Sequence, residues 1–284
     1  MDYSAIKNQK VVRLARKLLA KRPFLVLLQA LLITAAIGLA LISLNSKHQS
    51  FSLHGARPGL LALGFSVYFI FYLAFALHWA YALFMSDQTF SRAQLLSFFA
   101  SQPYKYLPSS AFSMSARSIY AKKLGSKIIN TAKAQVRENL SLALSGGLLI
   151  LAVKVNVVLA IVAALILGLA TFGLARLKHH QKLLRYLPLI GLSATAWLIS
   201  AFAFWLIVRG VGVSVDYSQA LYLNTITFLA SIAAVFVPAG IGVREAILFS
   251  QNLGVVPVLT WRICTILVDV ISGVVAIFII HKKK

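Results

Sequence analysis

Six uninterrupted apolar stretches constrain this chain more than any other feature of its sequence. Most of them reach the roughly 20 residues that an α-helix needs to cross the hydrocarbon core of a bilayer. We therefore predict an all-α integral membrane protein and exclude a soluble enzyme. The predicted full spans cover residues 23–44, 60–85, 138–153, 155–175, 188–208 and 258–280.

Composition and charge agree with a membrane protein. Hydrophobic residues make up 60% of the 284 residues and charged residues only 12%, against about 25% charged in a typical soluble domain. The 28 Lys and Arg residues outnumber the 6 Asp and Glu residues, for a formal net charge of +22. In a membrane protein this excess indicates loops that face anionic lipid head groups, and we expect no nucleic-acid partner.

Two further apolar stretches, residues 94–119 and 218–253, are interrupted by proline and glycine. Proline removes a backbone donor and glycine frees the backbone, so both interrupt a helix. Non-helical backbone at membrane depth survives only inside protein or beside a water-filled cavity. We therefore predict two re-entrant or broken helices, with a pair of kinked full spans as the alternative. The predicted helix breaks are Pro108, Pro238, Gly240 and Gly242.

The distribution of basic residues predicts the topology. Residues 1–22 read as a basic amphipathic helix on the cytoplasmic leaflet. If both broken stretches return to their own side, 22 of the 28 basic residues lie in the cytoplasm, as the positive-inside rule requires. Residues 23–284 then form one membrane domain with halves 23–153 and 155–280, which we predict to be an inverted-topology repeat. We expect the bacterial cytoplasmic membrane, with both termini in the cytoplasm.

Ionisable side chains at membrane depth cost about 2.5–3.5 kcal/mol on insertion scales, so each is a candidate for function. The glycine-containing break before Arg244 predicts a helix start with free backbone N–H groups, which suits an anion; a loop with an interfacial salt bridge is the alternative. The candidate head-group ligands are Lys105, Arg117, Arg244 and Arg262, and their candidate charge partners are Glu138, Glu245 and Asp269.

Several of these residues have a structural interpretation as well. Arg262 and Asp269 lie on one helix face, so Asp269 can pair with a buried arginine to hold the bundle together or can act at the site. Glu138 can cap the start of its span or line a hydrated groove. Glu245 is expected to pair with Lys105, Arg117 or Arg262. His78, a lone histidine in the second span, is expected to be hydrogen-bonded within the bundle.

Part of this pattern resembles a known family. Residues 105–108 and 136–138, with Arg117 and Gly125, resemble the first signature of the flippase-like membrane region of lysylphosphatidylglycerol synthases. Residues 238–246 resemble its second signature, a proline–glycine turn followed by Arg-Glu. The resemblance implies movement of phospholipid head groups between leaflets. Some members add a cytosolic aminoacyl-transferase domain, which we do not expect in this chain.

Taken together, these features predict a lipid flippase or transporter. An anionic lipid, either a phospholipid or a polyprenyl-phosphate carrier, would pass its head group through a central charged cavity without cofactor or metal ion. The alternatives are a membrane-embedded enzyme, with a carboxylate as general base, and an accessory scaffold in lipid-linked saccharide or envelope-lipid metabolism. The expected partners are anionic membrane lipids, with a second copy of the chain or a lipid-modifying enzyme as further candidates.

Overall fold

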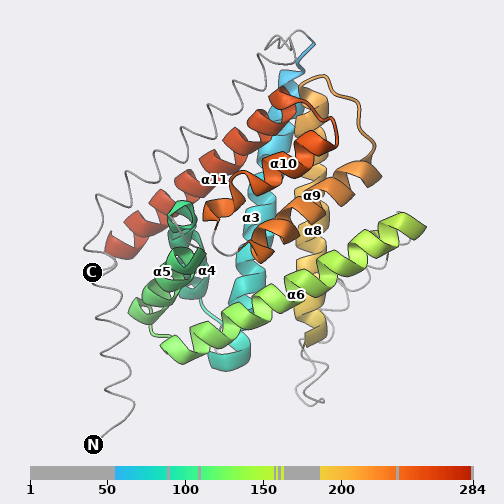
Figure 1. Cartoon of the computed structure of the whole chain (residues 1–284). Helices are drawn as coiled ribbons and strands as arrows, with labels where there is room; N and C mark the ends of the chain where they lie inside the picture. The colour runs from blue at the N-terminus through green and yellow to red at the C-terminus, as the bar shows by residue number, and fades with distance from the viewer. Residues whose placement is uncertain are drawn as a thin grey trace, which may run out of the picture.

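The computed structural model describes residues 55–87, 90–107, 110–156, 158, 161–162, 186–234 and 237–282. Regular structure in these ranges is entirely helical (Figure 1). The predicted amphipathic helix at 1–22, the span at 23–44 and the break residue Pro108 lie outside the described residues, as does most of the span at 155–175.

Four helices are long and apolar enough to cross a membrane, and they correspond to the second, third, fifth and sixth predicted spans. They are α3 (Pro58–Asp87), α6 (Ile128–Val155), α8 (Leu187–Gly210) and α11 (Val255–Lys282). The predicted start of the third span was wrong. Helix α6 begins ten residues before Glu138, because the intervening polar segment continues the helix and packs against its neighbour through Thr131 and Gln135.

Both interrupted stretches fold as two helices separated by a short 3₁₀ turn. The first comprises α4 (Arg92–Ser101), η1 (Gln102–Tyr106) and α5 (Ser110–Lys123), and the second comprises α9 (Tyr217–Ala233), η3 (Pro238–Gly240) and α10 (Val243–Ser250). Helix α4 packs against α5, and α10 packs against α9 (Figure 1). Each stretch therefore folds back on itself, and neither continues as a single kinked span.

The described elements follow the same order twice: a long helix, a broken stretch and a second long helix. Their packing is reciprocal. Helix α11 of the second series packs against α4 of the first, while α6 of the first packs against α9 of the second. Helices α3 and α8 pack together at the centre (Figure 1). The two breaks also meet, because η1 contacts η3.

Helix α6 exposes a stripe of apolar side chains and buries several polar ones. Leu140, Leu144 and Leu148 are each more than half exposed, whereas Glu138 and Ser141 are buried. A helix at a water-facing surface shows the opposite arrangement. An exposed apolar stripe of this kind fits a lipid environment.

The close approach of α11 to the first break depends on Gly273. A Cβ atom built at this position would lie 2.4 Å from both Cγ and Cδ of Pro103. The proline ring is rigid and lies in η1, so it cannot easily move aside. Gly273 therefore sets the distance between α11 and the turn that carries Lys105.

We expect Gly273→Ala to lower the free energy of unfolding by about 1–3 kcal/mol, the usual cost of overpacking. Gly147→Ala is the matched control, because a Cβ at this other helical glycine meets nothing within 4 Å. Alanine there should stabilise α6 by roughly 0.5–1 kcal/mol. Thermal unfolding of both variants in detergent measures the difference, and equal stabilities would contradict the close contact.

Candidate functional site

A cavity of about 300 Å³ lies beside the two breaks. Its lining brings together all four predicted cations and two of the predicted carboxylates: Lys105, Arg117, Arg244, Arg262, Glu138 and Asp269. The third carboxylate, Glu245, is bound to Arg262. The chain contains only 6 Asp and Glu residues, so half of its acidic side chains belong to this cluster.

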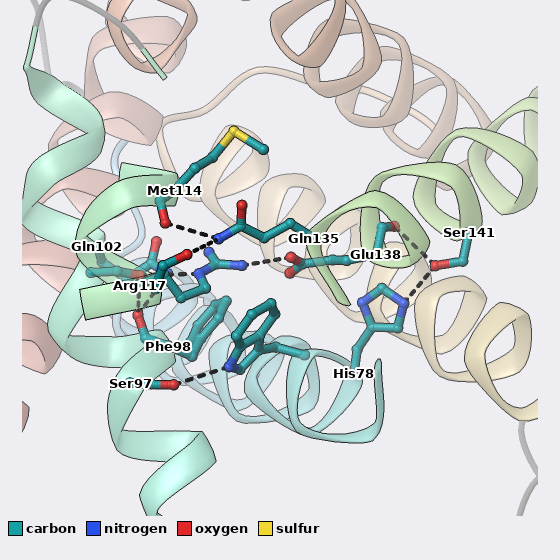
Figure 2. A network of polar contacts seen from close by, with 12 residues as sticks. His78, Ser97, Phe98, Gln102, Met114, Arg117, Gln135, Glu138 and Ser141 are labelled. Atoms are coloured by element: carbon teal, nitrogen blue, oxygen red, sulfur yellow. Dashed lines mark hydrogen bonds and ion pairs between the residues drawn. The ribbon is translucent and has the colours of Figure 1, made fainter. Parts of the chain in front are cut away.

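Arg117 on α5 pairs with Glu138 on α6, with 2.5 Å between Nη1 and Oε2 (Figure 2). Its Nε donates to the Ser101 hydroxyl at 3.2 Å, and its guanidinium lies over the rings of Trp79 and Phe98. One of the two interpretations of Glu138 was that it caps a helix start. Because α6 begins at Ile128, Glu138 instead lies inside the helix and holds a cation within the bundle. The ion pair ties the second helix of the broken stretch to a long helix.

His78 on α3 extends this network, as Figure 2 shows. Its Nε2 lies 2.8 Å from the Ser141 hydroxyl, which itself donates to the backbone carbonyl of Glu138 at 2.9 Å. Since a hydroxyl has a single hydrogen to donate, this geometry fits a His78 that carries a proton on Nε2 and donates it to Ser141. His78 is thus a hydrogen-bonded residue of the bundle, as predicted.

Lys105 in η1 pairs with Asp269 on α11, with 2.7 Å between Nζ and Oδ2. The Tyr106 hydroxyl donates to the same carboxylate oxygen, and the Lys105 ammonium also donates to the Tyr72 hydroxyl at 3.0 Å. Asp269 therefore has a lysine as its partner rather than a buried arginine. The reason is that η1 turns its basic residue toward α11, where Gly273 allows close contact.

Arg262 on α11 donates to Glu245 on α10, and its terminal nitrogens lie 3.4 Å from the Ala239 carbonyl. The other Glu245 oxygen accepts from the Gly242 N–H at 2.7 Å. At the predicted anion site one of the expected free donors is therefore already occupied, because a carboxylate at the third helical position reaches back to the cap. Burial by itself would raise the pKa of Glu245, but Arg262 and the backbone N–H lower it below its ordinary value.

Arg244 on α10 is held differently from the other cavity cations. Its Nε donates to the Ser231 hydroxyl at 2.7 Å, and its guanidinium lies 4.4 Å from the centre of the Phe228 ring. Among the described residues, no carboxylate lies within 4.0 Å of Arg244 and neither terminal nitrogen has a hydrogen-bond partner. Burial, and then the charge of Arg262, lowers the pKa of Arg244 to about 10, so it stays protonated at neutral pH.

Sequence reasoning missed the neutral residues that position these charges. Tyr106 and Ser231 orient Asp269 and Arg244, and Gln135 joins α6 to α5 by donating to the Met114 carbonyl at 2.8 Å (Figure 2). Gln135 has a signal in the sequence, because it precedes Glu138 by one helical turn on the same face. Ser231 has none, because its role depends on contact with a different helix.

The cluster has an excess of positive charge. Four cations face three carboxylates, which leaves one positive charge, and within the described part of the chain Arg244 is the cation without an ion pair. No group of His, Cys, Asp or Glu among the described residues could hold a metal ion. The cavity is therefore suited to an anion. No protein-family model, curated protein or solved structure matches the chain.

Proposed function

We propose that this chain is a multi-pass membrane protein that moves the anionic head group of a lipid between the two leaflets through the charged cavity. The observation that carries the proposal is Arg244, which lines the cavity and whose terminal nitrogens have no hydrogen-bond partner among the described residues. A guanidinium offers two parallel N–H donors that match two oxygens of a phosphate. The lipid is a phospholipid or a polyprenyl phosphate, and its chains stay in the bilayer.

The repeated order and reciprocal packing of the helices support an inverted-topology repeat, with each broken stretch entering the membrane as a re-entrant element. Transporters with such repeats bind their substrate where the repeats meet. Alternate opening of the two breaks would expose the cavity to one leaflet at a time. We place the chain in the bacterial cytoplasmic membrane with both termini inside, in line with the resemblance to the flippase-like region described above.

An embedded enzyme is the weaker proposal. A general base must accept a proton from its substrate. Each carboxylate of this cluster is held by a cation, Glu138 by Arg117, Glu245 by Arg262 and Asp269 by Lys105, and a neighbouring positive charge weakens a carboxylate as a base until that cation is drawn away.

Reconstituted vesicles test the proposal with fluorescently labelled phosphatidylglycerol as the probe. We expect wild-type protein to accelerate its movement between leaflets and Arg244→Gln to slow it about tenfold or more, because hydrogen bonds to charged groups contribute about 1.5–3 kcal/mol. The matched control is Arg209→Gln, since exposed Arg209 also lies over an aromatic ring, at 5.0 Å from Trp205, but does not line the cavity. Vesicles with wild-type protein that move the probe no faster than empty ones would refute the proposal.

A further inference from the structure

One oxygen of the buried Asp269 carboxylate has no hydrogen-bond partner among the described residues. Its side chain is 0% exposed and lines the cavity. Oδ2 accepts from both Lys105 and Tyr106, whereas Oδ1 has no hydrogen-bond partner among the described residues. An unpaired buried oxygen is costly, and such an exception in a folded protein calls for an explanation.

A proton fits this position better than a metal ion does. A metal ion needs several ligands, and among the described residues no group of three His, Cys, Asp or Glu side chains includes Asp269. The charged and titratable groups that line the cavity with Asp269 are Lys105 and Tyr106 on η1, Tyr68 on α3, Arg117 on α5, Glu138 on α6, Arg244 on α10 and Arg262 on α11. Helices α4 and α8 also pack on α11, but they contribute no charged side chain to the described cavity lining.

We propose that Asp269 is a proton-binding site that couples proton movement to lipid movement. The inference rests on the proposed function and adds its coupling ion. A proton taken up on Asp269 removes the charge that holds Lys105, which already lines the cavity and is 28% exposed, so its ammonium is free to turn toward a bound head group. The freed ammonium then joins Arg244 in binding the lipid phosphate.

Charge balance gives the coupling its direction. With Asp269 ionised, the seven clustered charges sum to one positive charge; with Asp269 protonated they sum to two. A head group with one negative charge binds the second state more tightly, because both unpaired cations can reach its phosphate. When the lipid leaves, Asp269 releases its proton and recaptures Lys105. One proton and one monoanionic head group thus cross together without net movement of charge.

Proton uptake on binding tests the coupling directly. Short-chain phosphatidylglycerol is added to the detergent-solubilised protein in weakly buffered solution with a pH indicator. By linkage, wild-type protein should take up as much as one proton per bound lipid. Asp269→Asn, which is close to isosteric, and Lys105→Gln should each bind lipid without uptake. Asp216→Asn removes an exposed carboxylate outside the cavity, and it should keep the wild-type uptake.

The rate of lipid movement in vesicles gives a second readout. The phosphodiester of phosphatidylglycerol keeps one negative charge between pH 8 and pH 6, so only the protein titrates. Wild-type movement should accelerate as the pH falls, by at most about tenfold per pH unit for one proton. Asp269→Asn should move lipid at the same rate at both pH values.

The outcomes separate the two proposals. Lipid binding without proton uptake, or an Asp269→Asn variant with the wild-type pH dependence, overturns the coupling and leaves lipid transport standing. A stronger response to a sodium gradient than to a proton gradient overturns it as well. If wild-type protein neither binds nor moves the probe, the proposed function falls and the coupling falls with it.

Discussion

Glu138→Ala should lower the free energy of unfolding by about 3–5 kcal/mol, because it leaves the guanidinium of Arg117 enclosed without its carboxylate. The two side chains are only 13% and 4% exposed, and their charged atoms lie 2.5 Å apart. Such a largely buried pair is screened less by solvent than a surface pair. Chemical or thermal unfolding in detergent measures the change.

A second variant separates the ion pair from simple packing. Replacing both partners, Arg117→Met with Glu138→Leu, removes the uncompensated charge and should recover most of the lost stability. Asp216→Ala is the control for loss of a carboxylate, because Asp216 is exposed and makes no side-chain capping bond. That change should stay within about 0.5 kcal/mol. A double variant as unstable as Glu138→Ala would show that shape, not charge, accounts for the loss.

Gly240→Ala should cost about 2–5 kcal/mol, from two causes that act together. Gly240 has φ +65°, which disfavours any residue with a Cβ. A Cβ atom built there would also lie 2.3 Å from the Ser231 hydroxyl oxygen and 2.5 Å from its Cβ. Ser231 must therefore move, and Arg244 loses the hydroxyl that positions its guanidinium.

Gly242 provides the matched control two residues further along. It has φ +87°, but a Cβ there meets nothing within 4 Å, so Gly242→Ala should show only the backbone strain of about 1–2 kcal/mol. The two variants should also differ in their affinity for short-chain phosphatidylglycerol, which only Gly240→Ala should weaken strongly. Equal losses of stability and affinity would mean that contact with Ser231 does not govern the Arg244 position.

The sequence alone was enough to predict the four long helices that the structure describes and the two interrupted stretches between them. A stretch of about 20 apolar residues carries its own signal, because each backbone group bonds within the helix and the side chains need only a non-aqueous surrounding. Helices α3, α8 and α11 begin and end close to the predicted bounds. Proline and glycine interrupt a helix at their own positions, whatever packs around them. Both broken stretches could therefore be recognised without knowing which helices they contact.

Only the tertiary structure decided how the charges pair. Lys105 and Asp269 lie far apart in sequence and meet because Gly273 lets α11 approach η1. Glu245 turns to Arg262 and the Gly242 N–H, and this leaves Arg244 without an ion pair among the described residues. Hydropathy reports how deeply a residue is buried, but the pairing of charges depends on which helix faces meet, and that follows from packing between distant segments.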